Sequence, residues 1–146
     1  MLKVEQPLAL VCIFTWLGFV CAISFLEAWL KFRAPGVTLP IGLSIGKLVF
    51  KALNRIEWIF AIAVLISAIW NKTQFSSLQF LILVILLSIL VLQTAWLLPQ
   101  LDARAELYIK GDKAAPSNLH FYFIAGESLK VIGLIVYGTR LFEQIK

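Results

Sequence analysis

Four long apolar stretches dominate the chain and predict four helices, at about residues 8–30, 46–70, 78–98 and 119–142. Crossing the roughly 30 Å hydrocarbon core of a bilayer takes about 20 helical residues, and each stretch reaches that length. Lipid offers no hydrogen-bond partners to backbone N–H and C=O groups, so apolar runs of this length must be helical. The short links between the runs favour an all-α fold, an antiparallel four-helix bundle with four transmembrane helices.

The composition places the chain among integral membrane proteins. Of its 146 residues, 61% are hydrophobic and only 14% are charged, whereas soluble domains have about 25% charged residues. The length predicts one domain over 1–146. The first apolar stretch is too long for the core of a secretory signal, so we expect it to be retained. We expect a multi-pass protein of the bacterial inner (plasma) membrane.

The distribution of the net charge of +5 predicts an orientation. With four spans, both termini and the 71–77 link share one side, while most basic residues fall in the 31–55 and 99–118 links. The positive-inside rule then places these two links in the cytoplasm and the termini outside. No basic run with interleaved aromatic residues is present, so nucleic acid is not an expected partner. The expected partner is the lipid bilayer, and a second copy of the chain (in a homo-oligomer) or another membrane protein is a further possible partner.

The fourth apolar stretch carries two charges, Glu127 and Lys130, near its middle. A helix that starts near Ser117 places Glu127 about 15 Å along its axis, close to the bilayer midplane. A charge at that depth costs at least about 2.5 kcal/mol. Helical spacing puts these charges on a stripe that we expect to face the bundle interior. The stripe consists of His120, Phe123, Glu127, Lys130 and Leu134.

Two interpretations of this stripe stay open. In the first, Glu127 belongs to a structural ion-pair network with Lys130, and with Arg55 or Lys51 as further partners. In the second, Glu127 titrates and His120 relays protons towards the cytoplasm. Glu27 ends the first stretch on the same side of the membrane. The candidate buried polar cluster is therefore Glu27, Lys51, Arg55, His120, Glu127 and Lys130.

The segment that leads into the second stretch has a basic helical face, made of Lys47, Lys51, Asn54 and Arg55. These turns either lie at the membrane interface, with the cations reaching to headgroups, or form a basic wall along a polar cavity. The preceding connector, 33–47, contains proline and glycine and is typical of a loop. A re-entrant segment is the alternative for this connector.

The sequence gives little support for a metal site, a cofactor or an enzymatic activity. One histidine and two cysteines nine residues apart do not make a usual zinc site, and the axial ligands of a haem are missing. The chain has no P-loop, dinucleotide fingerprint or nucleophile elbow. We expect no cofactor, no metal and no catalytic residue, and nothing in the sequence argues for an enzyme.

Several segments together resemble the transmembrane-protein-205-like group of small four-helix membrane proteins. They are WLG at 16–18, IGKLVFKALNRIE at 45–57, LVLQTAWLLPQLDARAELY at 90–108 and NLHFYFIAGESLK at 118–130. The resemblance covers most of the chain. Its motifs are an aromatic-Leu-x-Pro exit from the third helix and a histidine near the start of the fourth. It implies a multi-pass membrane protein and supplies no substrate.

Three functions follow from these features, in order of preference. The first is a structural or accessory membrane component with a buried polar cluster, because every polar feature has a packing explanation. The alternative is a small proton-linked transporter that uses Glu127 and His120. The third is a membrane enzyme.

Overall fold

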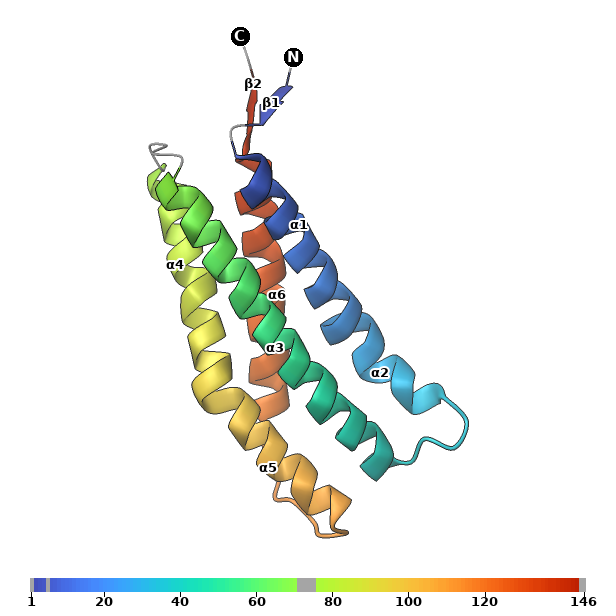
Figure 1. Cartoon of the computed structure of the whole chain (residues 1–146). Helices are drawn as coiled ribbons and strands as arrows, with labels where there is room; N and C mark the ends of the chain where they lie inside the picture. The colour runs from blue at the N-terminus through green and yellow to red at the C-terminus, as the bar shows by residue number, and fades with distance from the viewer. Residues whose placement is uncertain (1, 5, 71–75, 145–146) are drawn as a thin grey trace.

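The computed structural model of the protein describes residues 2–4, 6–70 and 76–144 (Figure 1). Most of them are helical, with short stretches of wider π-helix or tighter 3-10 helix inside longer segments, and a short strand lies near each terminus. In chain order the elements are β1 (Leu2–Val4), α1 (Pro7–Val20), the π-helical η1 (Cys21–Glu27), α2 (Ala28–Leu30), the 3-10 helical η2 (Lys31–Arg33), α3 (Leu39–Trp70), α4 (Ser77–Leu92), the π-helical η3 (Gln93–Leu97), α5 (Leu98–Ile109), α6 (Leu119–Thr139) and β2 (Phe142–Gln144).

These elements join into four helical segments that are long and apolar enough to cross a membrane. The segments are Pro7–Arg33, Leu39–Trp70, Ser77–Ile109 and Leu119–Thr139. The prediction of four long apolar helices is therefore confirmed. The fourth segment begins at Leu119, where the fourth stretch was expected to begin, and the backbone N–H of Leu119 donates to Ser117 Oγ at 3.2 Å.

The expected loop at 33–47 is wrong from Leu39 onward, and so is the re-entrant alternative, because these residues belong to α3. Pro40 is the second residue of this helix, where the missing N–H of proline needs no intrahelical partner. The chain turns over 34–38 instead, and Gly36 adopts a φ of 81° there. This left-handed conformation is one that glycine accepts without a steric penalty.

The third helix does not end at Pro99 as expected. It continues through η3 and α5 to Ile109, so the link between the third and fourth segments covers only 110–118. Proline disturbs a regular helix by removing an N–H and crowding the carbonyl four residues earlier. Here it lies two residues after the end of a π-helical stretch, where the regular hydrogen-bond ladder is already interrupted.

The helical segments lie side by side, and both chain termini lie at the same end of the molecule (Figure 1). At that end β1 and β2 pair antiparallel, with Leu2 opposite Gln144. The 34–38 and 110–118 links lie at the other end. α1 packs against α3 and α6, α3 against α5, and α4 against α6. The link between α3 and α4, 71–75, lies outside the described residues.

The interior between the segments contains an apolar core, and large apolar side chains also cover much of the outer surface. Large side chains such as Ile59, Trp70 and Phe121 are exposed along the outside. Helices that are hydrophobic all round are typical of a membrane span. The buried apolar core consists of Ala9, Cys12, Ile13, Trp16, Val20, Ala61, Val64, Ile82, Leu83, Leu86, Leu90, Leu134, Tyr137 and Leu141.

Candidate functional site

Three charged side chains lie together inside the protein. Lys130 and Glu127 come from α6 and Glu57 comes from α3, and their exposed fractions are 0%, 1% and 2%. Glu127 Oε1 is 2.6 Å from Lys130 Nζ, so the ion pair expected between these two residues is present. Lys130 Nζ also donates to Glu57 Oε1. One ammonium group thus bridges two carboxyl groups on different helices.

Polar side chains from the other segments surround the two carboxyl groups. Trp16 on α1 donates from Nε1 to Glu57 Oε1 at 2.9 Å. Ser24 Oγ donates to Glu127 Oε2 at 2.6 Å, and Gln93 Nε2 donates to Glu127 Oε1 at 2.7 Å. All four long helical segments therefore contribute a side chain to this set. We call these six residues the buried polar cluster: Trp16, Ser24, Glu57, Gln93, Glu127 and Lys130.

Both π-helical stretches supply a partner of Glu127. Ser24 lies in η1 and Gln93 lies in η3. A π-turn inserts an additional residue into the helical repeat, which rotates the following side chains around the axis, and such turns are frequent at functional sites. The irregular helical geometry thus occurs where two polar groups have to point inwards at a buried carboxyl group.

The charge count of the buried polar cluster is uneven. It holds two carboxyl groups and one ammonium group, so its formal charge is −1 with both carboxyl groups ionised and zero with one of them protonated. Charges buried in a low-dielectric interior are tolerated when they are paired and hydrogen-bonded. The chemistry available to this set is therefore ion pairing across helices and binding of one proton.

The predicted cluster of six residues is correct only for Glu127 and Lys130. Arg55 and Lys51 are exposed, so neither pairs with Glu127. Their positions on α3 lie away from Glu57, because two residues from Arg55 correspond to about 200° of rotation and six residues from Lys51 to about 240°. His120 is also exposed, seven residues and about 10 Å along the axis from Glu127. Glu27 is partly buried and pairs locally with Lys31, at 3.1 Å.

Sequence reasoning missed Glu57, Gln93 and Ser24. For Glu57 a signal was present, since it is a lone carboxylate within an apolar run and lies opposite the basic face of the same helix. Gln93 and Ser24 carry no charge, so neither stands out by itself. Both nevertheless continue the helical repeat of buried residues, Gln93 three residues after Leu90 and Ser24 four residues after Val20, so the hydrophobic pattern contained their inward direction.

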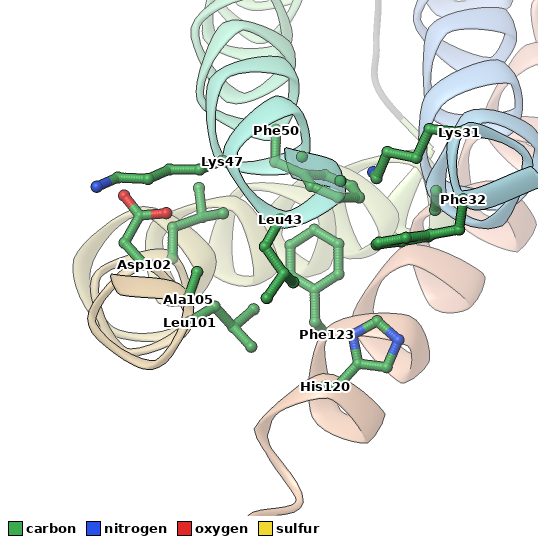
Figure 2. A pocket seen from close by; sticks show the side chains of 14 residues that line it. Lys31, Phe32, Leu43, Lys47, Phe50, Leu101, Asp102, Ala105, His120 and Phe123 are labelled. Carbon is green, nitrogen blue, oxygen red and sulfur yellow. The ribbon is translucent and has the colours of Figure 1, made fainter. Parts of the chain in front are cut away.

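A cavity of about 150 Å³ lies beyond the cluster, towards the end that carries the 34–38 and 110–118 links. Figure 2 shows it between the start of α3, α5, the start of α6 and the segment that contains Lys31 and Phe32. Its floor is aromatic, with Phe50 and Phe123 packed edge to face at 5.2 Å between ring centres. His120 and Lys31 lie at its edge, which is where the structure places the predicted histidine.

The cations around this cavity already have partners. Lys31 pairs with Glu27 and lies 5.3 Å from the centre of the Phe50 ring. Lys47 forms an ion pair with Glu106. Because Phe123 is buried between the cavity and Glu127, the cavity does not extend the buried polar cluster.

Tyr137 allows a test of how much a buried hydroxyl without a partner costs in stability. Its side chain is fully buried in the apolar core, and its hydroxyl has no hydrogen-bond partner within the described part of the chain. A buried polar group without a partner costs about 1–3 kcal/mol. We expect Tyr137→Phe to leave the free energy of unfolding unchanged or to raise it by about 1 kcal/mol.

The buried thiol of Cys12 can measure this free energy. Cys12 is 8% exposed, and its labelling by a thiol reagent in a Cys21→Ser background reports the opening equilibrium. The matched control is Tyr122→Phe, at a half-exposed tyrosine of the same helix, which should leave the labelling rate unchanged. Faster labelling in Tyr137→Phe alone would show that its hydroxyl has a stabilising partner.

Within the described ranges, no three or more His, Cys, Asp or Glu side chains gather in a way that could hold a metal ion. Comparison of the chain with protein-family models, with curated proteins and with solved structures gives no match. The function is therefore argued from the geometry of the site alone.

Proposed function

We propose that the chain is a multi-pass integral membrane protein whose four helical segments cross the bilayer as an antiparallel bundle. In this proposal it serves as a structural or accessory membrane component, and the buried polar cluster holds the four segments in one register. The resemblance to the transmembrane-protein-205-like group agrees with this class. The end with the 34–38 and 110–118 links is cytoplasmic by the positive-inside rule, and the membrane is the bacterial inner membrane.

The structural role is supported by one observation, namely that the charged groups of the buried polar cluster find their partners within this chain. Each of its charged groups has an oppositely charged neighbour, and each carboxyl group accepts a further hydrogen bond from another segment. In lipid, helices do not gain from hydrophobic burial against each other, so packing and interhelical hydrogen bonds determine how they associate. Polar contacts between all four segments therefore specify one arrangement.

A proton-linked transporter is the second candidate, and the charge count of the cluster favours it. Two carboxyl groups that share one ammonium group form a place where a single proton can bind. Intramembrane carboxyl groups are common in proton relays. A relay through His120 would have to pass Phe123, whose buried ring lies between the two positions along α6.

Glu127→Gln separates the two functions. The substitution leaves Glu57 and Lys130 as a pair of equal and opposite charge, and the glutamine can still accept from Ser24. We therefore expect the free energy of unfolding to fall by less than about 1.5 kcal/mol, which is the scale of one neutral hydrogen bond. Cys12 labelling measures this change.

Proton movement is measured on the same variant. Wild-type protein and Glu127→Gln are reconstituted into liposomes with a pH gradient and an enclosed pH-sensitive dye. A structural component should dissipate the gradient no faster than protein-free liposomes in either form. A wild-type proton flux that disappears in a folded Glu127→Gln protein would establish the transporter and overturn the structural role.

A further inference from the structure

A second polar feature lies on the outer side of the protein, between α3 and the η3–α5 segment. It is a cavity of about 510 Å³, and we call it the basic notch. The two helices that form the notch, α3 and α5, pack against each other. The residues of the notch that matter below are Lys51, Asn54, Arg55, Trp58, Thr94 and Asp102.

The two cations of the notch have no ion-pair partner. Lys51 and Arg55 lie four residues apart, on one face of α3, and both are exposed. Within the described residues, neither comes within 4.0 Å of a carboxylate. Asp102, which also lines the notch, is its single acidic side chain. The notch therefore carries an excess of one positive charge, and the nearby Lys47 is already paired with Glu106.

The remaining polar groups of the notch are bonded to each other. Asn54 Nδ2 donates to Thr94 Oγ1 at 3.0 Å, and Trp58 Nε1 donates to the same oxygen at 2.9 Å. Thr94 Oγ1 in turn donates to the carbonyl oxygen of Leu90 at 2.7 Å. These bonds tie α3 to η3 and form a fixed wall. Neither cation takes part in these hydrogen bonds, and the attraction between Lys51 and Asp102 acts over more than 4.0 Å, so both cations can still bind an anion.

The notch lies at the depth of lipid headgroups if the bundle crosses the membrane. Trp70, 78% exposed, marks the other end of α3, and tryptophan is enriched at membrane interfaces. At 1.5 Å per residue, Lys51 is about 28 Å and Arg55 about 22 Å from Trp70. Since the hydrocarbon core is about 30 Å thick, Lys51 lies at its boundary. The long side chain of Arg55 can extend to the same boundary.

From the free cations, the fixed polar wall and the depth, we infer that the basic notch binds the phosphate of an anionic phospholipid of the cytoplasmic leaflet. Lys51 and Arg55 contact the phosphate oxygens, and Trp58 supports the adjoining glycerol and acyl region. Basic pockets between membrane helices on the cytoplasmic side are suited to anionic headgroups. This inference rests on the proposed membrane insertion and adds a lipid class and a site to it.

Lipid binding is measured on the purified, delipidated full chain by native mass spectrometry in detergent, with titration of phosphatidylglycerol or phosphatidylcholine. We expect selective retention of phosphatidylglycerol. The double variant Lys51→Gln/Arg55→Gln should weaken this binding roughly 30-fold, from two lost contacts. Asp102→Asn removes the competing carboxylate and should strengthen it a few-fold.

The matched control is Lys110→Gln/Lys113→Gln, which removes the same charge from two exposed residues at the same end of the molecule. It should bind phosphatidylglycerol like the wild type. Equal loss in both double variants, or no loss in either, would overturn the site. Cys12 protection verifies that each variant is folded.

Two further measurements distinguish a failure of the lipid site from a failure of the membrane proposal. Competition by inorganic phosphate at concentrations that match the lipid would assign the notch to a free phosphate and overturn the lipid assignment. Alkaline carbonate extraction of membranes tests insertion independently of lipid preference. Release of the protein by carbonate would overturn the membrane proposal and the lipid site together, whereas retention without phosphatidylglycerol selectivity would overturn the lipid site alone.

Discussion

Lys130→Met is expected to lower the free energy of unfolding by about 3–5 kcal/mol, the range for removing one partner of a buried ion pair. Lys130 is the only cation near Glu57 and Glu127 within the described structure. Without its ammonium group, two buried carboxyl groups face each other with no opposite charge. The rate of Cys12 labelling should rise by about two to three and a half orders of magnitude, since about 1.4 kcal/mol corresponds to a factor of ten.

Because the buried polar cluster holds two carboxyl groups and one ammonium group, removing the lysine and removing a carboxylate should have different effects on stability. Removing a carboxylate leaves one charge of each sign, whereas removing the lysine leaves two charges of the same sign. Lys130→Met should therefore be far more damaging than Glu127→Gln. The matched control is Leu129→Met, because the neighbouring Leu129 is 56% exposed, and exposed substitutions stay within about 0.5 kcal/mol.

A triple variant tests whether the loss comes from the charges. Lys130→Met combined with Glu57→Gln and Glu127→Gln removes all three charges and keeps the side-chain volumes similar. Replacing a complete buried ion pair is often neutral or stabilising. The triple variant should recover most of the stability that Lys130→Met loses. A triple variant as unstable as Lys130→Met would mean that the lysine acts through packing rather than through charge.

Trp16→Ala is expected to have the second large effect, a loss of about 3–5 kcal/mol. Trp16 is fully buried among core residues of four segments, and its indole N–H is bonded to Glu57. The alanine would leave a cavity and a carboxylate with one donor fewer. The measurement is again Cys12 labelling, with Trp70→Ala as the control at an exposed tryptophan.

Trp16→Phe divides this effect into two parts. The phenyl ring fills most of the space but cannot donate to Glu57. We expect a loss of about 1.5–3 kcal/mol, the range for a hydrogen bond to a charged group. If Trp16→Phe were as stable as the wild type, the indole N–H would contribute nothing, and Trp16 would have no part in the buried polar cluster beyond packing.

Much of the architecture could be predicted from the hydrophobic pattern. Apolar runs near 20 residues with few charges locate the four helical segments, because lipid and helix geometry leave few alternatives. The ends were less predictable. Pro40 lies in the first turn of a helix and Pro99 follows a π-helical stretch, so neither proline ends a helix.

The candidate site was only partly predictable. The spacing of Glu127 and Lys130 on one helix is a local property, and their pairing followed from it. The link from Lys130 to Glu57 joins residues 73 positions apart, and that from Ser24 to Glu127 joins residues 103 apart. No periodicity within one helix contains information on such pairs.

By itself, then, the sequence determined that this protein consists of long apolar helices and that α6 carries two opposite charges on one face. Only the tertiary structure decided which charges are buried together. It packed the side of α3 that carries Glu57 against the other segments and left the side with Arg55 and Lys51 exposed, and it brought Ser24 and Gln93 within hydrogen-bond distance of Glu127. The physical reason is that the rotation of a helix about its axis depends on how its neighbours pack against it. A helix that is apolar on all sides can pack in several rotations about its axis. The contacts of a few polar groups between helices determine which rotation is adopted.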